Sequence, residues 1–576
     1  MISAPDPRIG PALGRLFAKA EESGEAVRFS LPCGAALFQA DEPANELFLL
    51  MRGRLAALRP KAAEQGRFLG LIRPGEPAGE MSLIAGEAHS ADVVALRDCE
   101  LLSLPREAFL QAVETEPGLA LDMTRLILNR SRPAKSARAA EASVFGFLAL
   151  HADQRVRPLA DTIGSALRDA GYRVAVVGGE GLKQTETWFS ALEAGSDVVL
   201  LADEAEEGAW KHVMCGQVDR LFRVASGAHA PSADMDLASG AALDLHRLAD
   251  LLLVQEADCA MPSGSAAWMA AVHPDRLFHM RSGSGADAER LGRILTGRSV
   301  GLVLSGGAAR AYAHLGVIRE MRARGAPIDF IGGVSMGAII GACVAMDWSD
   351  EEMDERIRDA FVRSNPIDDI GIPLVALMRG RKMRTRLENH FGDQDIADLW
   401  LPFFCVSSNL TTGRPHLHTR GRLRDALTAS AALPGILPPS TAGDEVLVDG
   451  AVVNNFPVDI MRTLHPGPIV GADVSRGRSI TAEDLASGPW RQWLLGRGSA
   501  PIVALLMRAA TLSTAHEIIA AREASDVLIL PRIDGIDVAN WKAYEQAVAL
   551  GEAAAREALD ALTSPLSELR RAVNTS

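Results

Sequence analysis

A serine between two glycines is the residue of this chain best suited to nucleophilic chemistry. Residues 328–332 are mostly apolar and typical of a strand, Ser335 follows within Gly-Val-Ser-Met-Gly at 333–337, and small residues at 338–342 are typical of a helix start. A sharp turn from strand to helix exposes a serine hydroxyl, and only small neighbours fit around such a turn. This pattern predicts Ser335 as the nucleophile of an acyl transfer reaction.

A glycine-rich segment upstream could supply the hydrogen-bond donors that this reaction needs. The strand-like run 300–304 ends in Ser305, Gly306, Gly307, Ala308, Ala309 and Arg310. Backbone N–H groups of such a loop can be directed at the oxyanion of a tetrahedral intermediate. The pentapeptide alone is weak evidence, because glycine makes up 52 of the 576 residues. The two segments together are stronger evidence than either alone.

An aspartate follows a third apolar run. Residues 446–448 are apolar and lead into Asp449, Gly450 and Ala451. A carboxylate at a strand end can accept the serine proton directly if the fold places it within hydrogen-bond reach, which makes a Ser/Asp dyad without histidine possible. The alternative interpretations are a glycine-rich turn around Ser335 and a surface turn at Asp449. Spacing in the sequence does not decide between them.

These segments together resemble patatin-like phospholipases. The resemblance rests on the loop with Arg310, on 333–337, on Ser-Ala-Ala-Leu-Pro-Gly-Ile-Leu-Pro-Pro at 430–439 and on Asp-Gly-Ala at 449–451. Within that family the stretch 399–411 is similar to the neuropathy target esterase group. The resemblance implies a three-layer α/β/α hydrolase domain at 299–566. It also implies cleavage of phospholipid or lysophospholipid acyl esters, with Ser335 as nucleophile and Asp449 as base.

The same resemblance implies an oxyanion hole made by the backbone N–H groups of Gly306, Gly307 and Ala308, with Arg310 holding the loop. The family has glycine where this chain has Ala308 and Ala311. Alanine keeps the N–H donor, but a left-handed backbone at either position would cost roughly 1 kcal/mol or more.

Residues 1–135 are expected to form a separate domain. Short apolar runs alternate with turns between Val27 and Leu101, and a helical stretch follows at 106–128. Many short strands with regularly placed glycines predict a small β-roll closed by helices. The stretch Gly-Glu-Met-Ser-Leu at 79–83, followed by Ser90 and Ala91, resembles cyclic-nucleotide-binding domains.

That second resemblance implies a nucleotide site at Gly79, Glu80, His89 and Ser90, with Glu80 on a ribose hydroxyl. The family holds the cyclic phosphate with an arginine where this chain has His89. A histidine is mostly neutral near pH 7 and has fewer donors than a guanidinium. Cyclic nucleotide binding and a role in packing or regulation without nucleotide both remain open. The hydrolase reaction itself requires no cofactor.

Helices and strands alternate between residues 140 and 295, which predicts a parallel α/β scaffold domain. The loop 178–185 lacks the glycine spacing of a dinucleotide or P-loop cradle and is interpreted as a turn. A linker is expected at 281–287, ahead of the hydrolase domain.

Composition excludes several classes of function. The formal net charge of −14 argues against a nucleic-acid partner. The six cysteines contain no Cys-x-x-Cys pair, which indicates reduced thiols and no metal site. The N-terminus has no signal-peptide pattern and no run approaches 18 apolar residues, so a cytoplasmic protein is expected.

One segment could contact a membrane from the inner, cytoplasmic face. Residues 370–378 are apolar, and five cations follow at Arg379, Arg381, Lys382, Arg384 and Arg386. An apolar segment beside cations can rest on an anionic bilayer. The alternative is a helix whose basic face is solvated.

Two other functions remain open on the sequence. A Ser-His-Asp α/β-hydrolase would need a histidine after the acid, which leaves His465 or His516. A non-catalytic cyclic-nucleotide-type sensor would carry a degenerate hydrolase domain.

Overall fold

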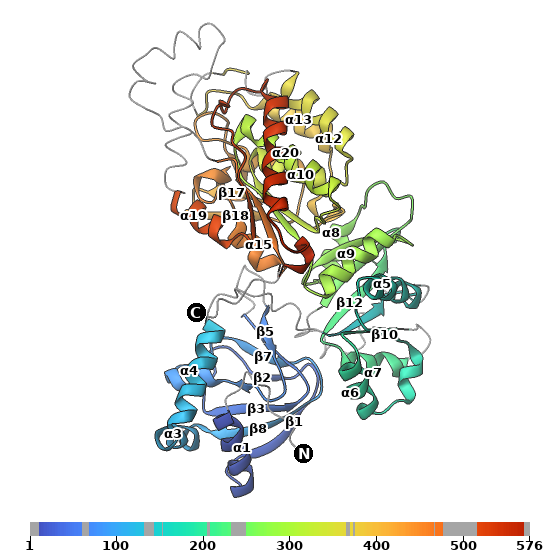
Figure 1. Cartoon of the computed structure of the whole chain (residues 1–576), viewed down its shortest axis with the longest axis vertical. Helices are drawn as coiled ribbons and strands as arrows, with labels where there is room; N and C mark the ends of the chain where they lie inside the picture. The colour runs from blue at the N-terminus through green and yellow to red at the C-terminus, as the bar shows by residue number, and fades with distance from the viewer. Residues whose placement is uncertain are drawn as a thin grey trace. The chain divides into compact units, whose positions relative to one another are not determined.

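The computed structural model describes residues 11–59, 68–131, 143–151, 154–203, 208–231, 249–363, 369–371, 375–465, 467–475 and 515–569. The chain forms two compact units (Figure 1). The first contains residues 1–257 and 271–297, and the second contains residues 258–270 and 298–571.

The first unit begins with the predicted β-roll. Its two four-stranded sheets have the orders β1-β8-β3-β6 and β2-β7-β4-β5, with antiparallel pairing throughout. The strands are β1 (Val27–Leu31), β2 (Ala36–Phe38), β3 (Glu46–Arg52), β4 (Leu55–Leu58), β5 (Phe68–Ile72), β6 (Pro77–Ala78), β7 (Asp92–Ala95) and β8 (Cys99–Pro105). The helices are α1 (Pro11–Ser23), α2 (Glu80–Ala85), α3 (Arg106–Thr115) and α4 (Pro117–Ser131).

Strand β8 is apolar at successive positions because both of its faces are covered. Leu101 packs inside the roll with Leu50, whereas Leu102 packs with Phe17 and Phe109 of the flanking helices. Neighbouring residues of a strand point to opposite faces, so a strand buried on both sides carries a continuous apolar run.

The second part of the first unit is the predicted parallel α/β domain. Its six strands are all parallel and have the order β10-β11-β9-β12-β13-β14. They are β9 (Val144–Ala149), β10 (Val174–Val177), β11 (Val198–Ala202), β12 (Arg220–Ser226), β13 (Ala249–Gln255) and β14 (Leu277–Arg281). The helices are α5 (Arg157–Asp169), α6 (Glu186–Gly195), α7 (Gly208–Gln217) and α9 (Gly285–Leu295).

The structure agrees with one expectation for this domain, the turn at 178–185, and corrects another. The loop at 178–185 contains a short 3₁₀ helix, η2 (Gly179–Lys183), where Gly181 lies so close to the Trp210 ring that a Cβ would collide with it. The linker expected at 281–287 was wrong, because this stretch is a tight turn from β14 into α9. Ser284 caps α9 by accepting a hydrogen bond from the Asp287 N–H at 3.1 Å.

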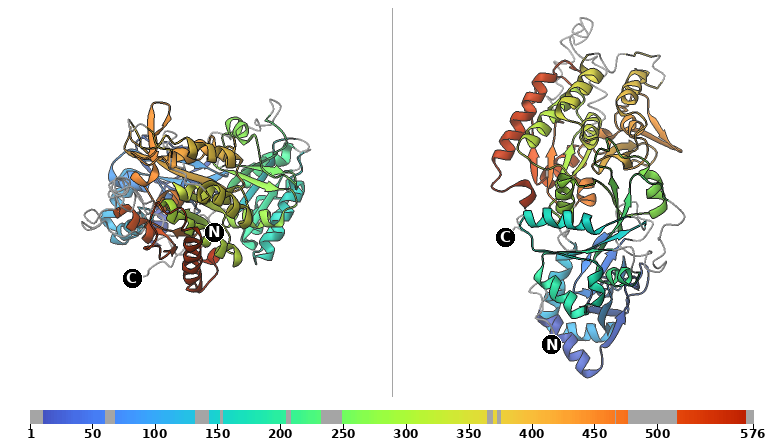
Figure 2. Two further views of the ribbon diagram at one scale, coloured as in Figure 1. Left: turned by 90° about the horizontal axis from the view of Figure 1, so that it is seen from above. Right: turned by 90° about the vertical axis from the view of Figure 1, so that its right-hand side faces the viewer.

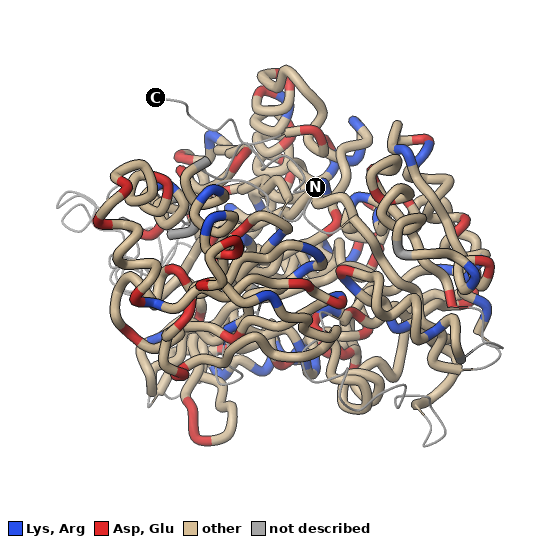
Figure 3. Tube along the Cα trace, turned by 90° about the horizontal axis from the view of Figure 1, so that it is seen from below, with Lys and Arg blue, Asp and Glu red and all other residues tan. Residues whose placement is uncertain are grey.

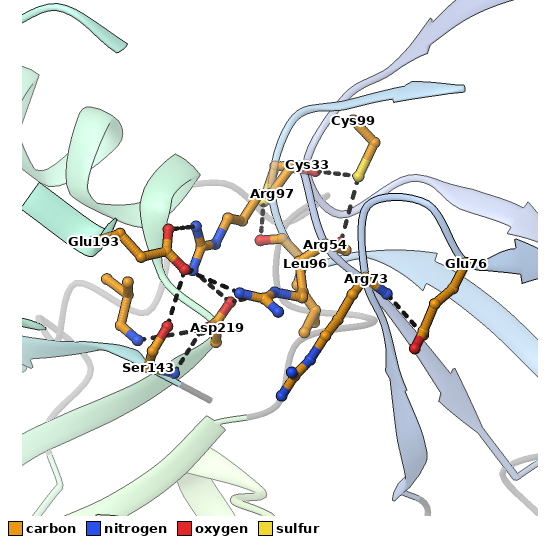
Figure 4. Close-up of polar contacts among 11 residues, drawn as sticks. Cys33, Arg54, Arg73, Glu76, Leu96, Arg97, Cys99, Ser143, Glu193 and Asp219 are labelled. Carbon is orange, nitrogen blue, oxygen red and sulfur yellow. Dashed lines mark hydrogen bonds and ion pairs between the residues drawn. The ribbon is translucent and has the colours of Figure 1, made fainter. Parts of the chain in front are cut away.

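A cluster of four charged residues joins the β-roll to the parallel domain (Figure 4). Arg97 lies 2.7 Å from both Glu193 and Asp219, and Arg54 lies 3.0 Å from Glu193 and 3.2 Å from Asp219. Burial alone would raise the pKa of Asp219, but Arg97 and Arg54 outweigh burial and lower it. Loss of one member of a buried ion pair leaves an uncompensated charge, so we infer that the cluster favours a contact between these two domains that keeps all four charges paired.

The second unit contains a mixed sheet of eight strands. Its order is β19-β20-β17-β16-β15-β21-β22, with β18 paired to β17. The parallel members are β15 (Gly301–Leu304), β16 (Phe330–Val334), β17 (Phe403–Asn409), β21 (Ile469–Ala472) and β22 (Val527–Ile529). The antiparallel members are β18 (Arg414–His418), β19 (Ser440–Ala442) and β20 (Glu445–Asp449).

Both faces of this sheet are covered. Leu302 and Val470 belong to the main core cluster of the unit, whereas a Cβ at Gly301 would meet Met461 on the other face. The helices are α10 (Ala313–Ala323), α11 (Met336–Ala345), α12 (Asp350–Ile357), α13 (Arg381–Phe391), α14 (Leu423–Ser430), α15 (Val458–Leu464), α19 (Ala515–Ala524) and α20 (Tyr544–Asp560). The predicted α/β class is confirmed.

Helices α10 and α20 lie along each other (Figure 2). A Cβ at Gly316 would collide with the Val548 carbonyl oxygen, and a Cβ at Gly551 would collide with the Ala313 carbonyl oxygen. The two glycines therefore let the backbones of the helices touch.

Residues 258–270 pack with the second unit, although the predicted domain at 140–295 included them. The Trp400 indole N–H donates to the Ala260 carbonyl at 3.1 Å, and the Ser265 N–H donates to the Asp398 carboxylate at 2.8 Å. Helix α8 (Ser265–Val272) begins within this segment.

Acidic and basic residues are interspersed along the trace rather than gathered by sign (Figure 3). Within the described part of the chain, no helix is both long and apolar enough to cross a bilayer.

Candidate active site

Ser335 occupies a strained turn between β16 and α11. Its φ of 55° and ψ of −126° lie in a region that residues other than glycine rarely adopt. A Cβ at Gly337 would collide with the Ser305 carbonyl, and one at Gly333 would lie 2.9 Å from the Leu304 carbonyl. The two flanking glycines therefore let the turn pack against the end of β15, which is the steric reason expected from the sequence.

The structure brings Asp449 to Ser335 from a position 114 residues away. The Ser335 hydroxyl donates to Asp449 Oδ2 at 2.7 Å, and the Ala451 N–H donates to Oδ1 at 2.9 Å. Asp449 is the last residue of β20, and the antiparallel pairing of β20 with β17 places it opposite Ser407. Strand β17 is the neighbour of β16, the strand that leads into Ser335. Ser335 is 8% exposed and Asp449 is 1% exposed.

The buried position of Asp449 changes its basicity. Burial raises the pKa of this carboxyl to about 6, although the hydrogen bonds from Ala451 and Ser335 act in the opposite direction. A general base works best when its pKa lies near the operating pH, so a carboxylate with this value is a better proton acceptor than an exposed one. It is still mostly ionised at pH 7.

Ser430 supports the turn from behind, a role that the sequence did not reveal. Its Oγ accepts the Ser335 N–H at 2.9 Å and donates to the Val406 carbonyl at 2.7 Å. The segment containing Ser430 contributed to the family resemblance, but no local pattern links it to Ser335. Ser335 also precedes the first turn of α11, where the helix dipole favours negative charge.

The glycine-rich loop presents two N–H groups near Ser335. Among the described residues, no acceptor bonds to the N–H groups of Gly307 and Ala308. The Gly306 N–H, in contrast, donates to the Asn455 carbonyl at 3.3 Å, and the Asn455 side chain donates to the Gly306 carbonyl at 3.3 Å. The expected set of donors is therefore reduced to Gly307 and Ala308, because the Gly306 N–H is already used within the fold.

Ala308 has the left-handed backbone considered from the sequence. Its φ is 48°, whereas Ala311 lies in the 3₁₀ helix η3 (Ala308–Tyr312) and has no positive φ. A left-handed alanine costs roughly 1–2 kcal/mol. The departure from glycine therefore matters at Ala308 and not at Ala311.

Arg310, which the resemblance assigns to holding the loop, bonds to a distant backbone carbonyl. Its Nε donates to the Ile536 carbonyl at 2.7 Å, and the neighbouring Ala309 N–H donates to the Val538 carbonyl at 3.0 Å. Burial lowers the pKa of Arg310 against the effect of Asp537 and Asp534. The contacts fix residues 536–538 beside the loop.

An apolar pocket of about 520 Å³, open mouth included, lies next to Ser335. Its lining includes Ala308, Met336, Ile339, Met383, Leu437 and Trp541. Its size and apolar lining suit a hydrocarbon chain.

The structure gives the histidine alternative no support. Among the described residues, no histidine bonds to Ser335 or Asp449. His465 bonds instead to Ser299, which precedes β15 and so lies at the opposite end of the sheet from Ser335. The side chain of His516 lies outside the described residues.

In the β-roll, the expected nucleotide residues do not form an open cradle. The His89 ring stacks on Phe38 with centroids 3.6 Å apart and is 5% exposed. Glu80 is 2% exposed, and Gly79 has a φ of 86° at the start of α2. Ser90 is exposed. Burial lowers the pKa of His89, so its ring stays neutral near pH 7.

Comparison with known protein families gives separate matches for the β-roll and for the part of the chain that contains Ser335 and Asp449. A family model described as patatin-like phospholipase matches residues 302–462, and one described as cyclic nucleotide-binding domain matches residues 28–116. An uncharacterized NTE family protein of Mycobacterium tuberculosis is 31% identical over 93% of this chain and 92% of its own length. Both resemblances expected from the sequence are thereby confirmed.

Two longer relatives carry functional names. A lysophospholipase of Aspergillus fumigatus is 24% identical over 92% of this chain and 42% of its own length. The neuropathy target esterase of Drosophila melanogaster is 24% identical over 77% of this chain and 35% of its own length. This chain therefore spans less than half of each of these two proteins.

Proposed function

Because the chain belongs to the NTE family, and a buried serine shares a hydrogen bond with a carboxylate beside an apolar pocket, we propose that it is a serine acyl hydrolase of phospholipids or lysophospholipids. The observation that carries the proposal is the 2.7 Å hydrogen bond from Ser335 to Asp449. The names of the relatives and of the matching family model support a lipid ester as substrate.

In the proposed reaction Ser335 Oγ attacks the ester carbonyl while its proton moves to Asp449 Oδ2. The N–H groups of Gly307 and Ala308 stabilise the oxyanion. Collapse of the tetrahedral intermediate breaks the bond to the leaving alcohol, which takes the proton from Asp449. Water then attacks the acyl-serine, and the same carboxylate accepts its proton and returns it to Ser335. The products are a fatty acid and a glycerophosphate-containing alcohol.

The pH dependence of hydrolysis tests this proposal. Asp449 acts as a base only when ionised, and its pKa is about 6. We expect kcat/KM for p-nitrophenyl butyrate to fall about tenfold per pH unit below that value and to level off above it. Release of fatty acid from lysophosphatidylcholine at pH 7.5, followed by mass spectrometry, identifies the lipid reaction. Absence of hydrolysis of both substrates by the folded protein would reject the function.

We also propose that the second unit contacts an anionic membrane surface through residues 369–371 and 375–384, the docking segment. Ile370 and Val375 are 69% and 68% exposed, and Arg379, Arg381, Lys382 and Arg384 are exposed beside them. Leu377 and Met378, which the sequence assigned to the same apolar surface, pack against the core instead. Arg386 is half-buried and lines another cavity, so it is not among the exposed cations.

The docking segment adjoins the pocket, which supports this role. The N–H groups of Leu377 and Met378 donate to the carbonyls of Gly435 and Ile436 at 2.9 Å. Ile436 and Leu437 line the pocket beside Ser335. A lipid drawn from the bilayer would therefore enter close to the exposed apolar side chains.

For the β-roll we propose a role without cyclic nucleotide. His89 lies buried against Phe38 and lacks the fork of donors that an arginine offers to a phosphate. We expect calorimetry with about 1 mM cyclic AMP or cyclic GMP to detect no saturable binding, and His89→Arg to increase the affinity. Tight binding by the unmodified protein would contradict this expectation.

A further inference from the structure

The apolar pocket beside Ser335 has a smaller neighbour inside the same unit. This second cavity, about 230 Å³ with its open mouth included, lies among α11, α12 and α13. Ile339 lines both cavities and is 1% exposed. Its N–H bonds to the Ser335 carbonyl, one helical turn back along α11. A single side chain close to the nucleophile is thus a shared wall of the two spaces.

The walls of the two cavities follow one another along the same elements. On α11, Met336 lines the first cavity and Cys343 the second. On α13, Met383 lines the first cavity, and Leu387, one turn later, lines the second. On both helices, therefore, the residues that line the second cavity lie C-terminal to those that line only the first.

An aromatic wall continues between the cavities as well. Trp541 lines the first cavity, Phe361 lines the second, and their rings stack with centroids 6.2 Å apart. Trp348 and Phe391 extend the aromatic lining of the second cavity and stack at 5.3 Å. Aromatic rings therefore border both cavities, in addition to the aliphatic side chain of Ile339 that they share.

Three basic side chains line the second cavity, Arg356, Arg386 and His390, and two of them contact acidic residues. Arg356 bonds to Glu352 at 2.7 Å and lies over the Trp348 ring, and His390 lies 3.3 Å from Asp359. Most of the other lining residues are aliphatic or aromatic, so the methyl end of an acyl chain would lie mainly against apolar side chains.

We propose that Ile339 sets the length of the acyl chain that the site accepts, because its side chain closes the first cavity against the second. This specificity role rests on the proposed acyl hydrolase function. Shortening the side chain would join the two cavities into one channel, and longer acyl chains would then bury further methylenes.

The expected effect is a shift in the dependence of kcat/KM on chain length. While a chain still lies within the first cavity, each added methylene raises kcat/KM about fourfold, and the curve levels off where Ile339 stops the chain. In Ile339→Ala the rise should continue to longer chains, so that two further buried methylenes give about a sixteenfold gain relative to the wild type. Ile339→Val should lie between the two.

The experiment measures kcat/KM of the full chain for p-nitrophenyl esters from four to sixteen carbons at one detergent concentration. Ile340→Ala is the matched control, since it removes the same atoms from the next residue of α11 and lines neither cavity. Thermal melts verify that each variant is folded. If Ile339→Ala is not folded, the chain-length profile of Ile339→Val is used to test the proposal.

The possible results separate this proposal from the proposed function. The role of Ile339 is supported if kcat/KM levels off at a longer chain length in the Ile339 variants than in the wild type, while Ile340→Ala levels off at the wild-type chain length. Folded, active Ile339 variants with the wild-type profile would overturn it and leave the hydrolase function intact. A wild-type chain without esterase activity on any of these esters would reject both.

Discussion

Asp449→Asn is expected to lower kcat/KM for p-nitrophenyl butyrate at least about a thousandfold, and Ser335→Ala by a similar factor. The asparagine has the shape of the aspartate and can still accept the Ala451 N–H, but its amide cannot take the proton of Ser335. Because the two side chains act as one unit, the double variant should be little worse than either single variant.

Variants of the two histidines serve as controls for the choice of base. His465→Ala and His516→Ala should keep most of the esterase activity, since His465 bonds to Ser299 at the far end of the sheet. Circular dichroism and thermal melts establish that all five variants are folded. A folded histidine variant without activity would favour a Ser-His-Asp mechanism, and an active Asp449→Asn would exclude the dyad.

The second large effect concerns vesicle binding. Replacing Arg381, Lys382 and Arg384 with glutamine should weaken binding to phosphatidylglycerol vesicles by roughly two powers of ten, because each cation near an anionic leaflet contributes about 1 kcal/mol. Hydrolysis of p-nitrophenyl butyrate should be nearly unchanged, since adsorption and acyl transfer are separate steps. Vesicle flotation at low and high salt measures the first quantity.

A matched triple variant tests whether position matters as well as charge. Arg414, Arg420 and Arg422 are also exposed cations of the second unit and lie outside the docking segment. Their replacement by glutamine removes the same charge and should reduce vesicle binding much less. Equal losses in the two triple variants would assign the effect to overall charge and remove the docking role.

The sequence predicted those parts of the site that depend on local pattern. The turn at Ser335 could be predicted because small residues stand between a strand-like segment and a helix-like segment. That combination is typical of a sharp turn that exposes a serine. Asp449 was identified through the resemblance. Its spacing from Ser335 in the sequence could not show that it would lie at the end of an antiparallel strand within hydrogen-bond reach of the serine.

The remaining features depend on contacts between distant segments. The hydrogen bonds from Gly306 to Asn455 and from Ser335 to Ser430 connect residues far apart in the chain. No pattern of neighbouring residues in the sequence indicates such bonds. The linker expected at 281–287 failed for another reason. Glycines and serines favour both linkers and helix caps, and here Ser284 caps α9.

The left-handed alanine at position 308 gives the oxyanion loop a property that glycine would not. Glycine moves easily between left- and right-handed conformations, whereas alanine has few alternatives once its neighbours hold it at a φ of 48°. Ser335, across the site, is held in a similarly rare conformation with a φ of 55°. The proposed nucleophile and a proposed donor for the oxyanion thus both have backbone conformations with few alternatives, and we expect little reorganisation when the oxyanion forms.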